Sequence, residues 1–270
     1  MKLGMSTYAW YDFPFSKMIP LLAETGYSAI SLGSRKEHTH YHTEEGRKRI
    51  RQILSDHDME LESVHAPAGI REGRLIDISD PDPTHRAHAI TETKHAIHAA
   101  AECGAAYVVI HPIGVKWRKG FNLSERSASA FQSLEQLQSY AETHGVKMAL
   151  ENLDPPEDRM FRAIYQQVIE LGMVYCYDNG HAFVDQDPSA IWKLMAPFVR
   201  TLHLHDNNGR KDTHDQLGTG QFPWQELRQW LKDSNYQGVI GLECRFRGQE
   251  ESEFKTWLLA NRQFVHGHFQ

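Results

Sequence analysis

Six apolar runs in this chain end in acid or histidine side chains. They read LESVHAP, AYVVIHP, VKMALEN, MVYCYDNGH, RTLHLHD and VIGLEC. The side chains at or just beyond their ends are His65, His111, Glu151, Asp178, His181, His203, Asp212, His214 and Glu243. Parallel strands of a closed barrel deliver their carboxyl ends to one mouth. The pattern therefore predicts a parallel barrel that directs metal-ligand side chains into a single opening.

Strand-like and helix-like segments alternate along the whole chain. The expected strands are 2–8, 28–33, 61–66, 105–112, 146–152, 173–178, 199–206 and 238–244. The expected helices are 16–25, 43–57, 84–103, 123–143, 160–171, 188–197, 223–233 and 251–264. Eight such pairs favour closure into a (β/α)8 barrel, a fold that typically takes about 250 residues. The 270 residues are therefore predicted to form an α/β protein, a single TIM-barrel domain over 1–270.

Composition excludes several classes of protein. The formal net charge of −6 provides no basic field for nucleic acid, and no apolar run approaches the roughly 20 residues of a membrane span. The N-terminus lacks the features of a signal peptide, and the three cysteines form no CxxC motif. We therefore expect a cytoplasmic enzyme with a small-molecule substrate and no nucleic-acid or membrane partner. A homo-oligomer is compatible with the sequence.

Strand parity places the polar ends on the inner face of the barrel, because residues two apart face the same way. The inward sets are Ser63/His65, Val109/His111, Ala149/Glu151, Cys176/Asp178, Thr201/His203/His205 and Gly241/Glu243. The intervening residues, such as Val64, Ile110 and Leu150, are apolar and suit packing against helices. The ligand-type groups should therefore share one lumen.

Carboxylates and imidazoles without thiolates suit Zn²⁺, Mn²⁺, Co²⁺ or Fe²⁺ rather than Ca²⁺. Glu151, Asp178, His203 and Glu243 end four consecutive strands and can meet at one central ion. One such residue alone is more often a turn former. A buried unpaired carboxylate is costly, however, and nine ligand-type residues together predict at least one bound metal.

The chain resembles the xylose-isomerase-like TIM-barrel superfamily, which joins sugar phosphate isomerases and epimerases to endonuclease IV-type AP endonucleases. The motifs that carry the resemblance are VHAP, VVIHP, ALEN, DNGH, HLHDN, DTHDQLGTG and LEC, in this order. The resemblance implies that Glu151, Asp178, His203 and Glu243 form the central metal set.

The two branches of the superfamily imply different uses of the other residues. In the endonucleases, the position of Glu151 bridges to a second ion that the positions of His65 and His111 also hold. A third ion there is held by the positions of His181, Asp212 and His214. In the epimerases, the positions of Glu151 and Glu243 are the acid/base pair, and that of His181 contacts the substrate. The sequence thus implies one to three ions, Zn²⁺ or Mn²⁺.

The surroundings of the ligands favour the isomerase branch. His205 stands where the endonucleases have Asn, and Thr213 stands where they have an Arg. The loop between His203 and Asp212 is short, and Ala-Pro-Ala-Gly follows His65 without the bulky residues that endonucleases insert into DNA.

We therefore expect a metal-dependent isomerase or epimerase of a small sugar, sugar phosphate or related keto-polyol. It would act by proton abstraction next to a carbonyl, with the metal stabilising the enediolate. Glu151 and Glu243 are the expected catalytic pair. His181, His205, Lys116 and Arg245 are the expected substrate-binding residues, the last two as an anion clamp. The alternatives are a multi-zinc phosphoesterase of the endonuclease IV type, and a lyase or dehydratase on the same barrel.

Overall fold

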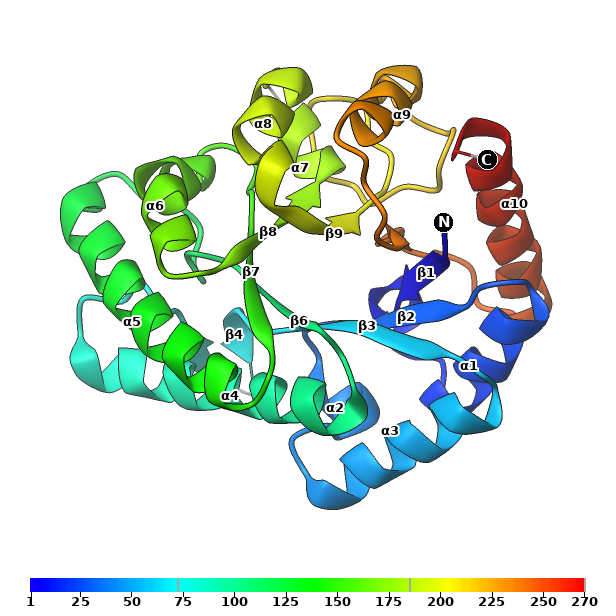
Figure 1. Cartoon of the computed structure of the whole chain (residues 1–270), viewed down its shortest axis with the longest axis horizontal. Coiled ribbons are helices and arrows are strands. Elements are labelled where there is room, and N and C mark those ends of the chain that lie inside the picture. Colours follow the sequence, from blue (N-terminus) through cyan, green and yellow to red (C-terminus); the bar gives the residue numbers. More distant parts are fainter. Residues whose placement is uncertain (72, 185, 270) are drawn as a thin grey trace.

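The computed structural model describes residues 1–71, 73–184 and 186–269, and its central feature is a barrel of eight parallel strands (Figure 1). The strands are β1 (Leu3–Ser6), β2 (Ala29–Leu32), β3 (Glu60–His65), β6 (Tyr107–Ile110), β7 (Lys147–Glu151), β8 (Val174–Asp178), β9 (Val199–His203) and β10 (Ile240–Leu242). Their order is β10-β1-β2-β3-β6-β7-β8-β9. A parallel bridge between Leu204 and Leu242 joins the two end strands. All eight expected strands are confirmed, and so is the TIM-barrel fold.

Helices surround the barrel between successive strands (Figure 1). They are α1 (Phe15–Glu24), α3 (Glu44–Asp56), α4 (Pro83–Cys103), α5 (Leu123–Thr143), α6 (Asp158–Glu170), α8 (Pro188–Met195), α9 (Trp224–Asp233) and α10 (Glu251–Phe269). Several begin where a polar side chain accepts a hydrogen bond from the first turn, as Asp82 and Asp187 do ahead of Pro83 and Pro188. The last helix continues to Phe269, beyond the predicted end at 264.

The apolar side chains form two separate cores. Val109, Ala149, Val174 and Cys176 pack inside the barrel. Their sequence neighbours on the same strands, such as Val108, Ile110 and Leu150, belong to the much larger core between barrel and helices. The predicted strand parity is therefore confirmed for these residues, because the inward side chains form one cluster and the outward ones another.

The pairing of β2 with β3 contains an irregularity. Ile30 pairs with Leu61, but the next residue, Ser31, pairs with Ser63. Glu62 is therefore the extra residue of a β-bulge, a feature that changes the direction of a side chain.

Several short elements lie outside the predicted ones. They are the 3-10 turns η1 (Thr7–Trp10) and η2 (Ala196–Phe198), helices α2 (Lys36–Thr39) and α7 (Asn179–Phe183), and strands β4 (Gly69–Arg71) and β5 (Arg74–Ile76). The antiparallel β4–β5 hairpin follows the end of β3. Its sequence, GIREGRLI, carries no alternating apolar pattern, so no hairpin was predicted there.

Within the described residues, no helix combines the length and apolar character needed to cross a membrane. Cys103, Cys176 and Cys244 are free thiols.

Candidate metal centre

The nine acid and histidine side chains predicted to face one mouth are gathered at the carboxyl ends of the strands. Three groups of ligand atoms together include all nine residues, and within each group the atoms lie within 4.8 Å of one another. The three groups are Glu151/Asp178/His203/Glu243, His65/His111/Glu151 and His181/Asp212/His214, and a further combination, His65/His203/Glu243, overlaps the first two. Because Glu151 belongs to two of them, it lies between the first two groups.

Four imidazoles surround the carboxylate of Glu151, which is completely buried. Its Oε2 lies 3.1 Å from His111 Nε2 and 3.2 Å from His65 Nε2. Its Oε1 lies 3.2 Å from His203 Nδ1 and 3.5 Å from His181 Nδ1. A carboxylate in this position can bridge two ions, or one ion and a substrate.

Glu243 and Asp178 complete the central group from two other strands. The Oε2 atom of Glu243 lies 3.3 Å from the same His203 Nδ1 that contacts Glu151. Asp178 ends β8 and begins α7, where its Oδ1 accepts a hydrogen bond of 2.7 Å from the backbone N–H of His181. Asp178 is therefore held in place because its side chain also caps the first turn of α7.

The third group joins α7 to the loop after β9. Asp212 Oδ2 lies 2.9 Å from His214 Nε2 and 3.4 Å from His181 Nε2. His214 has a positive φ of 50°, and its Nδ1 lies 2.8 Å from the backbone oxygen of Glu243. That contact directs Nε2 toward Asp212, in the way that an outer partner orients a metal-binding imidazole.

Two asparagines connect the strand ends that carry the central group. The Asn152 amide donates to the backbone oxygen of Asp178 and accepts from its N–H, both at 2.9 Å. Asn179 makes the same pair of bonds, both at 2.9 Å, with the backbone of His205. Each asparagine directly follows a ligand-type residue. Its side chain therefore continues the hydrogen bonding between neighbouring strands just beyond the strand ends, where the ligands must be positioned.

The electrostatics of the cluster are dominated by the burial of unlike charges. Burial opposes ionisation of Glu151, but His203 and His111 more than compensate and hold its pKa well below its usual range. Burial also lowers the pKa of His214, yet the hydrogen bond and charge of Asp212 raise it to about 9. Imidazoles whose pKa is raised by the neighbouring carboxylates, as those of His203 and His214 are, thus balance the buried negative charge, and a bound metal ion would take over this role by displacing protons.

A cavity of about 570 Å³ lies above the three groups. Tyr8 and Tyr11 form part of its wall, and the β4–β5 hairpin contributes Ile70 and Arg71. Ile70 is 72% exposed, unusual for a large apolar side chain. The volume is within the range of small-molecule sites.

The remaining predicted substrate-binding residues differ in position. His181 and Lys116 line the cavity, and Lys116 is at its rim with a side chain 83% exposed. His205 is fully buried behind Asp178, with Nε2 3.2 Å from Asp178 Oδ1 and its ring stacked on His214. Arg245 is exposed and lies over the Tyr8 ring, at 6.0 Å, outside the residues that line the cavity. The structure thus brings His181 and Lys116, but not His205 or Arg245, to the cavity surface.

Comparison with known proteins identifies the family. A family profile described as xylose isomerase-like TIM barrel matches residues 19–260. The chain belongs to this family. A curated relative, fructoselysine 3-epimerase of Shigella flexneri, is 26% identical over 261 residues, which are 90% of each chain.

Two solved structures share the fold of this xylose isomerase-like barrel. D-psicose 3-epimerase with D-tagatose, from Clostridium cellulolyticum, has a TM-score of 0.85 and 16% identity over 100% of both chains. The IolI protein with a bound zinc atom has a TM-score of 0.81 and 17% identity, over 100% of this chain and 98% of that one.

Two residues near the cluster were missed by sequence reasoning. Glu157 is buried in the cavity wall, where Oε1 accepts a 2.7 Å hydrogen bond from the backbone N–H of Trp117. Its Oε2 has no hydrogen-bond partner among the described residues. Cys176 lies inside the barrel within 4.8 Å of ligand atoms of Glu151 and His203. Glu157 could not be recognised from sequence, because it lies in a charged loop (DPPEDR), whereas strand parity placed Cys176 in the lumen without indicating it as a possible ligand.

Proposed function

We propose that this protein is a metal-dependent isomerase or epimerase of a small keto sugar. The observation that carries the proposal is the placement of two carboxylates around one imidazole. Glu151 and Glu243 approach His203 Nδ1 at 3.2 and 3.3 Å, from strands β7 and β10. Both line the cavity. A substrate in the cavity would therefore have a carboxylate on either side of its reacting carbon.

The donor set fits a divalent transition metal. Three carboxylates and one imidazole form the central group, and all four side chains are buried. Oxygen and nitrogen donors of this kind suit Zn²⁺ or Mn²⁺. When bound, such an ion supplies Lewis-acid stabilisation of negative charge that develops on a substrate oxygen.

The chain's own residues would provide the proton transfers and the orientation of the substrate. In this proposal one of Glu151 and Glu243 removes the proton next to the carbonyl, and the other returns one to the same or the adjacent carbon. His181 would hold a hydroxyl group, since it lines the cavity above Asp178. The surrounding aromatic and apolar wall would limit the access of water.

The cavity wall supports a substrate with both hydroxyl and anionic groups. Arg71, Lys116 and Arg118 line it on the basic side and suit a phosphate or carboxylate. Glu157 Oε2 has no hydrogen-bond partner among the described residues, although it lies 3.9 Å from Lys116 Nζ, and it suits a hydroxyl or ammonium group. The relative named for fructoselysine supports a keto sugar with a polar substituent.

Solvent exchange tests the proposed chemistry. Incubated in D2O with Mn²⁺ or Zn²⁺, the protein should place deuterium on the carbon next to the carbonyl of a ketose or ketose phosphate. Glu243→Gln should slow exchange by at least about 10²-fold, because general acid–base catalysis contributes about 10²–10⁴-fold. Glu226→Gln on α9 is the matched control, because Glu226 is exposed and distant from the cluster.

Metal stoichiometry and product analysis separate the alternative activities. The three groups of ligand atoms also match the metal requirement of a multi-zinc phosphoesterase. Three zinc ions per chain, incision of abasic DNA and no deuterium exchange into any ketose would contradict the proposal. Loss of water from the substrate instead of rearrangement would identify a lyase.

A further inference from the structure

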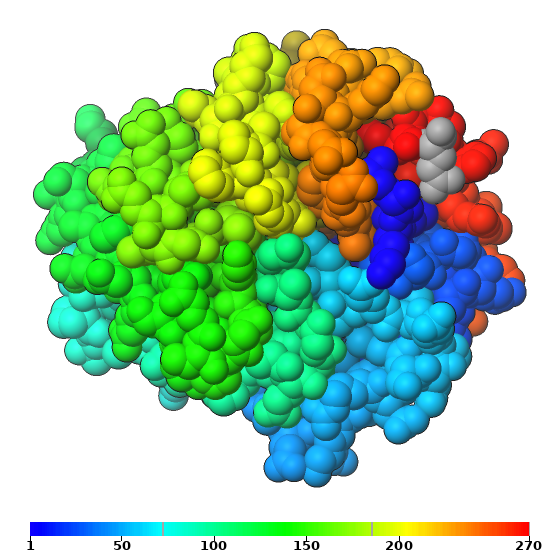
Figure 2. All heavy atoms as spheres, in the orientation of Figure 1, coloured from blue at the N-terminus to red at the C-terminus, as the bar shows by residue number. Residues whose placement is uncertain are grey.

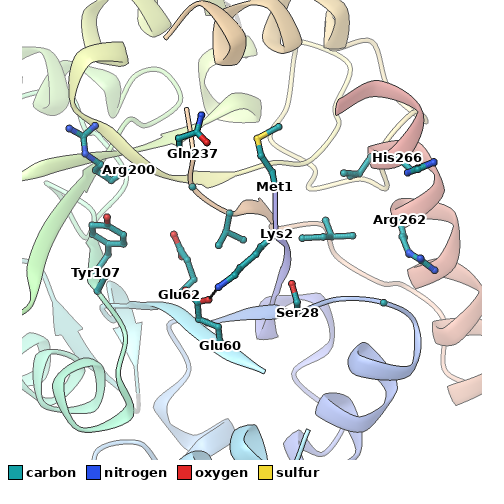
Figure 3. A pocket seen from close by; sticks show the side chains of 16 residues that line it. Met1, Lys2, Ser28, Glu60, Glu62, Tyr107, Arg200, Gln237, Arg262 and His266 are labelled. Carbon is teal, nitrogen blue, oxygen red and sulfur yellow. Dashed lines mark hydrogen bonds and ion pairs between the residues drawn. The ribbon is translucent and has the colours of Figure 1, made fainter. Parts of the chain in front are cut away.

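A second cavity opens at the opposite end of the barrel from the metal centre. Its volume is about 700 Å³, and residues at the amino ends of β1, β3 and β6 line it, together with residues of α10. Figure 3 shows this cavity, with the Lys2 side chain near the middle of the view and α10 along one side. Figure 2 shows the N-terminal residues at the surface of the same face. Nothing in the proposed sugar chemistry uses this cavity.

A buried glutamate, one of whose carboxylate oxygens has no hydrogen-bond partner among the described residues, lies in its wall. Glu62 is only 8% exposed, and its Oε1 has no hydrogen-bond partner among the described residues. The β-bulge against β2 places this side chain, and Figure 3 shows it extending from β3 into the space between Tyr107 and Lys2. Burial raises the pKa of Glu62, while the nearby hydroxyls of Ser63 and Thr201 oppose the rise. An unsatisfied buried carboxylate is costly, so its retention needs an explanation.

The rim of the cavity carries positive charge that no carboxylate of the described chain neutralises. Arg200 is held by hydrogen bonds from Nη1 to the backbone oxygens of Val199 and Pro197, at 2.7 and 3.3 Å. Arg262 of α10 also lines the cavity, and neither guanidinium forms an ion pair within the described residues. The third cation, Lys2, is already paired with Glu60. The cavity therefore offers an acceptor in its wall and unpaired guanidinium groups at its rim.

We propose that this cavity is a second ligand site, for a small organic anion that also carries hydroxyl or ammonium groups. Glu62 accepts a hydrogen bond from one of these groups, and the rim arginines bind the anionic group. A simple anion would leave Glu62 unpaired, and a simple cation would be repelled by Arg200 and Arg262. The volume accommodates a molecule of monosaccharide size. This site is independent of the proposed isomerase activity.

Calorimetric titration with four probes tests the site. D-Gluconate supplies hydroxyls with a carboxylate, and 4-aminobutyrate supplies an ammonium group with a carboxylate; these two distinguish the donor types. D-Glucitol lacks the anion, and acetate lacks the donor. At least one of D-gluconate and 4-aminobutyrate should bind, and more tightly than D-glucitol and acetate, which are the control compounds. Glu62→Leu, Arg200→Met and Arg262→Met are the variants, with Glu243→Gln at the metal centre as the matched control.

The expected result is an increase of about tenfold or more in Kd in Glu62→Leu and in at least one arginine variant, with little change in Glu243→Gln. Glu62→Leu should also raise the Tm of the ligand-free protein, because it removes an unpaired buried carboxylate. A structural role for Glu62 predicts the opposite shift, so a fall in Tm would overturn the proposal. The proposal would also be overturned if neither D-gluconate nor 4-aminobutyrate binds. The same holds if binding persists in all three variants of the cavity, or if it is lost only in Glu243→Gln. The surface arginine variants keep the test decisive if Glu62→Leu does not fold.

Discussion

At the scale of single residues, the metal centre depends on side chains that hold the ligands as well as on the ligands. Asn179 is fully buried and satisfies both backbone groups of His205, two residues beyond His203. Asn179→Ala leaves a buried N–H and a buried C=O without partners, and each such group costs about 1–3 kcal/mol.

We therefore expect Asn179→Ala to lower the free energy of unfolding by about 2 kcal/mol or more and to weaken metal binding. Chemical denaturation and metal titration measure the two effects. Asn122→Ala is the control, because Asn122 only caps α5 and its loss should cost about 1 kcal/mol with no change in metal affinity. Equal metal affinity in both variants would show that the Asn179 bonds do not position the ligands.

Glu62 gives a prediction about pH. Its folded-state pKa is raised above the ordinary value of 4.5, so near that pH the folded protein binds a proton more readily than the unfolded chain. Its contribution to stability therefore falls as pH rises from 4.5 through the folded pKa. Glu62→Gln should match the native protein in stability at about pH 4 and exceed it at about pH 8. Urea denaturation at both pH values measures the difference in free energy of unfolding between Glu62→Gln and the native protein. The same difference at both pH values would contradict the prediction.

At the scale of elements, the β4–β5 hairpin and the loop after β6 form part of the wall of the cavity at the metal centre. Asp77, just after β5, joins them: its Oδ1 accepts hydrogen bonds of 2.9 Å from Ser79 N–H and 3.0 Å from Gly114 N–H. Its Oδ2 pairs with Arg126 of α5 at 2.9 Å, and both side chains are largely buried. The two segments pack so closely that a Cβ on Gly114 would lie 2.0 Å from the backbone oxygen of Ile76.

Asp77→Ala should therefore lower the free energy of unfolding by about 3 kcal/mol or more, because it leaves a buried guanidinium without its carboxylate and two backbone N–H groups without their acceptor. It should also raise KM through displacement of the hairpin and of Arg71 on it. Denaturation and steady-state kinetics measure the two effects. Asp187→Ala, which removes an exposed cap of α8, should cost about 1 kcal/mol and leave KM unchanged. If the KM of Asp77→Ala equals that of the control, the position of the hairpin does not affect substrate binding.

At the scale of the whole molecule, the barrel brings carboxylate and imidazole side chains from the ends of six strands, and from one loop, to a single mouth. Ions that bind only the folded barrel stabilise it by mass action, about 2.7 kcal/mol at a hundredfold excess over Kd. For a chain of this size each kcal/mol raises Tm by roughly 2–4 °C. Adding Zn²⁺ or Mn²⁺ should therefore raise Tm, and a chelator should reverse the shift. Glu151→Gln should abolish most of the shift, because Glu151 belongs to two of the ligand groups, whereas Glu226→Gln should retain it. An equal rise in Tm in Glu151→Gln and Glu226→Gln would show that the metal binds at another site.

The sequence alone determined the eight strand–helix units, the inward parity of the strands and the identity of the side chains at the mouth. These follow from local periodicity and from the rule that parallel strands share one carboxyl end. The resemblance already implied the division of the nine ligand-type residues into three groups, but only the tertiary structure showed that atoms such as His181 Nε2 and Asp212 Oδ2 meet across loops. It also buried His205, which the sequence had placed at the substrate. The β4–β5 hairpin, Glu157 and the unpaired carboxylate of Glu62 were likewise invisible in sequence. Their positions depend on distant contacts and on one bulged residue, and neither leaves a periodic pattern.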